Sequence, residues 1–145
     1  MAVSSFFIGL LLLQIDWTNE TKSNLQVALI QPNISQNQKW SPENRQQIMS
    51  ILERLTMSHW YKDVNIWPEA AVPAVRQTVS SYIKKLDAMS NLSGNTLITG
   101  IPTFNSANGS YHNSVISIGD TPGQYNKTKL VPFCEYVPGE SLLSC

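Results

Sequence analysis

The residues of this sequence that are best suited to catalysis lie in YNKTKLVPFCEYVPGE, residues 125–140, which brings together Lys127, Cys134 and Glu135. A thiol nucleophile, a cation for a developing oxyanion and a carboxylate base could be built from these three residue types. A further carboxylate, Glu69, stands in WPEAAVP directly after a short apolar run. Because apolar surroundings disfavour the charged carboxylate, we expect a raised pKa at Glu69, which suits a general base.

Each of these residues also has a purely structural interpretation. Glu69 fits a turn or a helix cap, and Lys127 fits a solvated lysine that protects the edge of a sheet, the role that we assign to Lys129. Tyr125 precedes Lys127 by two positions in an expected strand, so both side chains should lie on the same face. Position alone leaves both interpretations of Glu69 and Lys127 open.

The composition excludes several classes of partner. With 145 residues, 42% hydrophobic and 14% charged, the chain fits one globular domain with a core. Ten basic and ten acidic side chains balance, and the lysines are scattered, so no nucleic-acid partner is expected. Cys134 and Cys145 lack the paired spacing of zinc ligands, and His59 and His112 each stand alone, so no metal site is expected.

The first residues are apolar, but the run is short. It extends from Phe6 to Leu13, whereas a membrane-spanning helix needs about 20 residues. It could be the tail of a membrane helix, an interfacial anchor or a segment packed on the domain. Trp17, at the place of an aromatic belt, favours the first alternative. We therefore expect a membrane-helix tail over residues 1–15, a polar linker over 16–24 and a domain over 25–145.

The rest of the sequence predicts the elements that must position these residues. Two helices are expected, one starting at Ser41 and ending near His59, and one from Val75 to residues 91–94. Three strands precede or follow them, and two more form a hairpin; their ranges are 25–32, 63–67, 95–102, 110–119 and 124–130. Alternating strands and helices predict an α/β fold with a mainly parallel sheet, strands buried on both faces and helices on both faces. Reactive groups should then gather at the carboxyl ends of the strands.

Two motifs, VNIWPEAAVP and YNKTKLVPFCEYVP, following VALIQPNISQNQKW, resemble the nitrilase or carbon–nitrogen hydrolase superfamily. More narrowly, they resemble the periplasmic domain of the bacterial apolipoprotein N-acyltransferase family. The resemblance extends from Val27 to Leu143. It implies the nitrilase-like α-β-β-α sandwich, of which this chain would be the N-terminal part.

The resemblance also implies roles for individual residues. Glu69 falls on the general base of the family, Lys127 on its catalytic lysine, Glu135 on a supporting glutamate and Trp40 on a tryptophan near the active site, which we assign to substrate binding.

The nucleophile of the family is a cysteine well downstream of the lysine, in a part of the fold that this chain is expected to lack. Cys134 occupies a position where the family usually carries glycine, and Cys145 is too close to Lys127 to be the nucleophile. A disulfide between Cys134 and Cys145 stays open as an alternative. We therefore expect a truncated form that is inactive by itself.

By resemblance, the reaction is transfer of an acyl chain from a phospholipid to the N-terminal cysteine of a diacylglyceryl-modified apolipoprotein, the last step of bacterial lipoprotein maturation. It needs no metal or organic cofactor. The implied location is the bacterial inner membrane, with the domain facing the periplasm. Two alternatives remain: an amidase of the same superfamily, and a membrane-tethered fragment without catalytic activity.

Overall fold

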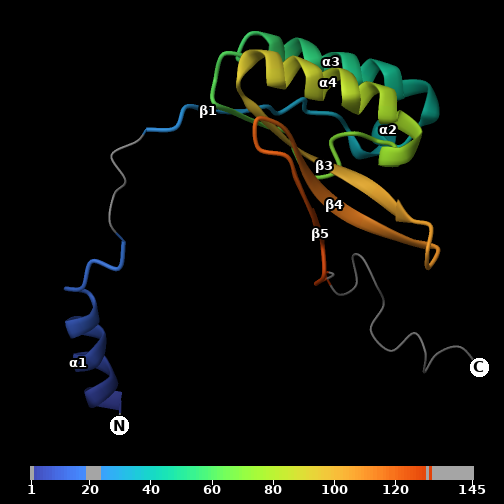
Figure 1. The fold of residues 1–145 in the computed structure, drawn as a ribbon. Coiled ribbons are helices and arrows are strands. Elements are labelled where there is room, and N and C mark those ends of the chain that lie inside the picture. Colours follow the sequence, from blue (N-terminus) through green and yellow to red (C-terminus); the bar gives the residue numbers. More distant parts are fainter. Residues whose placement is uncertain (1, 19–23, 130, 132–145) are drawn as a thin grey trace, which may run out of the picture.

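The fold contains one five-stranded sheet, seen in a computed structural model that describes residues 2–18, 24–129 and 131. The strands lie in the order β1-β2-β3-β4-β5; they are β1 Val27–Leu29, β2 Val64–Ile66, β3 Thr96–Asn105, β4 Ser110–Gly119 and β5 Gly123–Asn126 (Figure 1). Pairing is parallel from β1 to β3 and antiparallel from β3 to β5. The expected hairpin of β4 and β5 is confirmed. The antiparallel pairing of β3 with β4 departs from the expected mainly parallel sheet, because the short turn after β3 can join only an antiparallel neighbour.

The two expected helices are present. The first region contains α2 Gln36–Lys39, the 3₁₀ turn η1 Pro42–Asn44 and α3 Arg45–Met57, and the second contains η2 Arg76–Val79 and α4 Ser80–Ser93. The hydroxyl of Ser41 bonds the carboxylate of Glu43 and makes no capping hydrogen bond, so α3 starts later than its sequence signal predicts. Helix α4 ends at Gly94, whose φ of 63° is the left-handed conformation that terminates many helices.

Helices α3 and α4 lie side by side over one face of the sheet (Figure 1). The core forms between this face and the helices; its buried apolar side chains are Ala28, Ile30, Ile48, Met49, Leu52, Trp67, Ala71, Val72, Ala74, Val79, Ile83, Leu86, Leu97, Ile101, Ile116 and Ile118. This is one helix layer on one sheet layer, which confirms the α/β class.

The opposite face of the sheet carries no helix or strand of the described chain, and much of its surface is apolar (Figure 1). Ala28 points into the core at 9% exposure, whereas Leu29, its neighbour in β1, is 77% exposed. Val115 and Tyr125 extend this surface across β4 and β5. The expectation that β1 is buried on both faces, with helices on both faces of the sheet, is therefore wrong for the described residues, because only one face meets helices.

One buried polar side chain links α3 to the segment that follows β2. The Thr56 hydroxyl donates to the Leu52 carbonyl at 2.7 Å and accepts from the Trp67 indole N–H at 2.8 Å. On the neighbouring helix, burial, followed by the negative charge of Glu53, raises the pKa of the Tyr82 hydroxyl well above its ordinary value. The partly buried Tyr82 hydroxyl donates to the Met49 carbonyl at 3.4 Å and so links α4 to α3.

The N-terminal apolar segment forms helix α1, Ala2–Leu12. None of the helices in the described part of the chain has the length and apolar character needed to cross a membrane. The division into a membrane-helix tail over residues 1–15, a linker over 16–24 and a domain over 25–145 stays a prediction.

Candidate active site

Glu69 lies in the turn that follows β2. Beyond the end of that strand the chain stays beside β3, because the Trp67 N–H donates to the Ile98 carbonyl at 2.8 Å and the Gly100 N–H donates to the Pro68 carbonyl at 3.3 Å. Ala70 then has a φ of 47°, the left-handed conformation, which costs a residue with a Cβ about 1 kcal/mol or more. The hydrogen bonds with β3 stabilise this strained backbone conformation.

Gly100 allows this turn to approach the sheet. A Cβ at position 100 would lie 2.4 Å from the backbone nitrogen of Ala70 and 2.8 Å from the Cα of Glu69, and both distances are too short for any real Cβ. The obstructing atoms belong to the backbone, so no side-chain rotation can relieve the clash. The position of Glu69 thus depends on glycine at position 100.

Lys127 reaches the same place from β5. Its N–H donates to the Asn113 carbonyl at 2.8 Å, which extends the pairing of β4 with β5 by one residue beyond the end of the strand. The register sets Tyr125 opposite Val115. Tyr125 and Lys127 lie on one face, as the alternation along the strand predicts, and this is the face opposite to the helices.

The two charged head groups meet over this face. The Lys127 ammonium nitrogen lies 3.6 Å from Oε1 of Glu69, and Nδ2 of Asn113 donates to the same oxygen at 2.5 Å. This distance agrees with the expectation that reactive groups gather at the carboxyl ends of the strands, since Glu69 follows β2 and Lys127 follows β5. The second carboxylate oxygen, Oε2, has no hydrogen bond within the described chain, which leaves it open to accept a proton from another group.

The carboxylate is not buried by its apolar sequence neighbours. The Glu69 side chain is 65% exposed, whereas the Lys127 side chain is 28% exposed. The neighbours that follow Glu69, Ala71 and Val72, turn into the core under the helices and leave the carboxylate on the open face.

Around the pair lies an open pocket of about 390 Å³ with a mainly apolar floor. Its lining residues are Ile66, Trp67, Glu69, Ile98, Gly100, Asn113, Val115, Tyr125 and Lys127. A proton acceptor and a cation above an apolar floor suit acyl chemistry on a substrate with hydrocarbon parts. The described residues include no cysteine, and they contain no group of three metal-binding side chains.

Of the remaining predicted site residues, Trp40 is the one that the described part of the chain contains. Trp40 is 54% exposed at the end of α2 and is not part of the pocket lining. Its neighbour Lys39 donates from Nζ to the Glu69 carbonyl at 3.2 Å, so α2 does contact the turn. Glu135, together with Cys134 and Cys145, lies outside the described residues.

Three residues that no sequence motif indicated also contribute to the site: Asn113, Gly100 and Lys39. Asn113 holds both members of the pair, since its carbonyl accepts from the Lys127 N–H and its amide donates to Glu69. Strand alternation could have placed it on one face with Val115. Its partners could be found only from the pairing of β4 with β5.

Comparison with curated proteins shows consistent similarity to one kind of enzyme. The chain is 34% identical over 132 residues to the apolipoprotein N-acyltransferase of Methylococcus capsulatus, a match that covers 90% of this chain and 26% of the relative. The identity to the apolipoprotein N-acyltransferase of Vibrio cholerae is 40% over 135 residues, a match that covers 87% of this chain and 26% of the relative. The identity to the apolipoprotein N-acyltransferase of Pseudomonas syringae is 33% over 146 residues, a match that covers 99% of this chain and 29% of the relative. The chain thus spans about a quarter of the length of these relatives.

Solved structures with a similar fold come from the wider superfamily. A carbon–nitrogen hydrolase from Helicobacter pylori aligns with a TM-score of 0.53 at 16% identity, covering 77% of this chain and 42% of the hydrolase. Nit3 of Saccharomyces cerevisiae, a member of the nitrilase superfamily, aligns with a TM-score of 0.51 at 17% identity, covering 72% of this chain and 44% of Nit3. These similarities show that the fold is nitrilase-like. No protein-family model matches the sequence.

Proposed function

Because this chain belongs to the apolipoprotein N-acyltransferase family of the nitrilase superfamily, we propose that it supplies the general base and the oxyanion cation of an acyl transfer from phospholipid to apolipoprotein. The observation that carries the proposal is the meeting of Glu69 and Lys127 at 3.6 Å over an open apolar pocket. They come from different strand ends and contact each other only through the tertiary fold.

In the first half-reaction, Oε2 of Glu69 takes the proton of a cysteine thiol. The thiolate attacks the ester carbonyl carbon of the phospholipid, and the oxyanion that forms lies against the Lys127 ammonium. The tetrahedral intermediate then collapses, the carbon–oxygen ester bond breaks, and the lysophospholipid alkoxide leaves with the proton held by Glu69. The product on the protein is a thioester.

In the second half-reaction, the α-amine of the diacylglyceryl-modified cysteine of the apolipoprotein attacks the thioester carbonyl. Glu69 accepts the proton of the amine, and Lys127 again faces the oxyanion. An amide bond forms, the carbon–sulfur bond breaks, and the thiolate regains a proton from Glu69. Neither half-reaction requires a cofactor.

We assign the nucleophilic cysteine to sequence outside this chain, since the chain spans about a quarter of its relatives. Glu135 and Trp40 keep their proposed roles, the first as support for the site and the second in substrate binding. The apolar floor of the pocket suits acyl chains, and both substrates carry lipid. We therefore propose action at the bacterial inner membrane, with this domain on the periplasmic side.

The test is an acyl-transfer assay on a protein in which this chain is joined to the nucleophile-bearing remainder of the fold. Phospholipid vesicles supply the donor, a diacylglyceryl-modified peptide is the acceptor, and triacylated peptide is measured by mass spectrometry. We expect Glu69→Gln and Lys127→Met each to lower the rate at least about a hundredfold. Lys129→Met is the matched control, because Lys129 follows two residues later but does not line the pocket, and it should change the rate less than about twofold.

Three outcomes would contradict the proposal. Full triacylation by the 145-residue chain alone would refute an external nucleophile. Ammonia release from simple amides without acyl transfer would assign the chain to amide hydrolysis instead. Full transfer by both Glu69→Gln and Lys127→Met would leave the chain as a non-catalytic module.

A further inference from the structure

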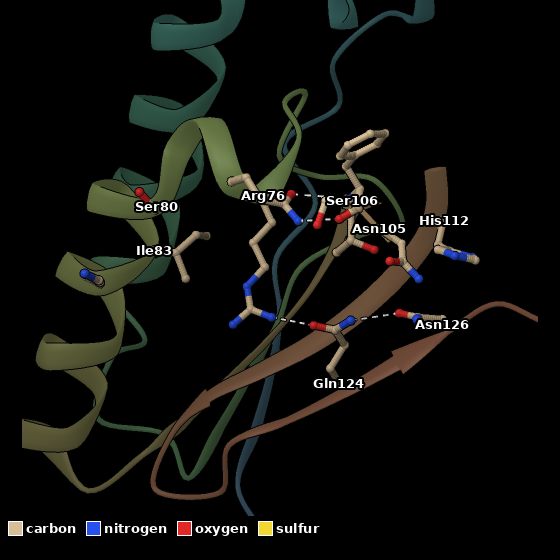
Figure 2. A pocket seen from close by; sticks show the side chains of 12 residues that line it. Arg76, Ser80, Ile83, Asn105, Ser106, His112, Gln124 and Asn126 are labelled. Atoms are coloured by element: carbon tan, nitrogen blue, oxygen red, sulfur yellow. Dashed lines mark hydrogen bonds between the residues drawn. The ribbon is translucent and has the colours of Figure 1, made fainter. Parts of the chain in front are cut away.

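A second cavity lies on the helix-covered face of the sheet, away from Glu69 and Lys127. It has a volume of about 500 Å³ and opens between the start of α4, the end of β3 and strand β5. Figure 2 shows the side chains that point into it, among them Arg76, Gln124 and Asn126. Since Gln124 and Asn126 alternate with Tyr125 and Lys127 along the chain, the two cavities lie on opposite faces of the same strand.

The two cations of this cavity form no ion pair with a carboxylate of the described residues. Arg76 and Lys84 line it, and no Asp or Glu is among its lining residues. The Arg76 guanidinium bonds only the Gln124 side-chain oxygen within the described chain, and Lys84 makes no ion pair or hydrogen bond there. Asp87 lines an adjoining cavity together with Arg76 and Lys84 but forms no ion pair with either, and its Oδ1 accepts the Gly119 N–H at 2.8 Å.

Two amide side chains of the cavity, Asn105 and Asn126, have nitrogens that donate no hydrogen bond within the described chain, whereas the oxygens of Gln124, Asn126 and Asn105 each accept at least one. The oxygen of Gln124 accepts from Arg76. The oxygen of Asn126 accepts from Gln124 at 2.9 Å and from Ser114 at 2.8 Å. The oxygen of Asn105 accepts from the backbone at 3.0 Å.

The donors left for a ligand come from three sides. Arg76, Ser80 and Lys84 lie on the helix side, the amide nitrogens of Asn105 and Asn126 lie on the strand side, and the Ser106 hydroxyl lies in the turn after β3. Donors converging from several directions match a tetrahedral oxyanion better than a planar carboxylate. Ile83 and Phe104 add apolar surface, and the volume exceeds that of one phosphate group.

We propose that this cavity binds the phosphate group of a phosphate ester, with Arg76 and Lys84 as its charged contacts and the ester's hydrocarbon part against Ile83 and Phe104. The site is independent of the acyl-transfer chemistry, because it shares no lining residue with the pocket of Glu69 and Lys127. A soluble phosphomonoester and a phospholipid headgroup offer the same chemistry.

The experiment uses the 145-residue chain, isotopically labelled, and follows the amide signals of Arg76 and Ser106 by NMR. One arm titrates butyl phosphate, and the other titrates phosphatidylcholine vesicles with and without phosphatidic acid. The variant Lys84→Gln removes a charge without breaking any hydrogen bond of the described chain. The matched control is Lys85→Gln, which removes the same charge from the next position of α4, where the side chain pairs with Glu53 at 2.8 Å.

We expect saturable binding, with an affinity about tenfold lower in Lys84→Gln and unchanged in Lys85→Gln. Added salt should also lower the affinity, because it screens the charges. Arg76→Gln should weaken binding at least as much. Lys84-dependent binding confined to the phosphatidic acid vesicles would assign the site to a lipid headgroup, and binding of butyl phosphate would assign it to a soluble ester. Absence of binding in both arms, or equal weakening by Lys84→Gln and Lys85→Gln, would overturn the proposal.

Discussion

The substitution Gly100→Ala tests whether the close approach of two backbone segments positions Glu69. The added Cβ would lie 2.4 Å from the Ala70 nitrogen, and ordinary van der Waals contact begins at about 3.4 Å. One segment must therefore move by about 1 Å. That movement disturbs the hydrogen bond between the Gly100 N–H and the Pro68 carbonyl, now 3.3 Å long.

The expected cost follows from overpacking against a rigid neighbour. Such clashes cost about 1 to 3 kcal/mol, and the upper end applies here because backbone atoms cannot rotate away. For a chain of this size, about 2 to 3 kcal/mol corresponds to a fall in Tm of about 5 to 10 °C. The matched control is Gly123→Ala, also in the sheet, where the new Cβ would meet only the Ser117 hydroxyl at 3.1 Å.

Thermal unfolding of both variants, followed by circular dichroism under identical conditions, measures the difference. Neither substitution changes the apolar surface on the open face of the sheet. Any self-association through that face should therefore shift the transition temperatures of both variants alike. We expect Gly100→Ala to unfold at least about 5 °C below Gly123→Ala. Equal transition temperatures would refute the reasoning that glycine at this position holds the turn of Glu69 against the sheet.

Three other predictions concern the core and the open face. Thr56→Val should destabilise the chain by about 1 to 3 kcal/mol, because the buried Trp67 N–H loses its acceptor, and adding Trp67→Phe should recover part of that loss in denaturant unfolding. Replacing Leu29 and Val115, 77% and 42% exposed, by Thr should raise the monomer fraction in sedimentation; an unchanged fraction would show that this face does not drive association. Since the pKa of Tyr82 is raised in the fold, its contribution to the free energy of unfolding is fully present below about pH 10 and is lost as the pH rises further. Tyr82→Phe should therefore flatten the decline of stability at alkaline pH, and an identical decline in the variant would contradict this.

The sequence by itself determined the elements and their order. Regular spacing of Ile48, Leu52 and their neighbours was enough to predict α3, and the glycine at position 94 was enough to predict the end of α4. Both signals are local, because helix faces and helix ends depend on residues within a few positions of each other. The motif around Glu69 and that around Lys127 were likewise readable as candidate chemistry.

The tertiary structure decided which of these residues meet. Nothing local to Lys127 specifies Asn113 as its neighbour, since that contact depends on the register of β4 with β5. The exposure of Glu69 also followed from the path of the chain beside β3, although its sequence neighbours are apolar. Local patterns fix dihedral angles and faces, whereas distances between strand ends depend on how the whole sheet pairs, which is why the site emerged only from the fold.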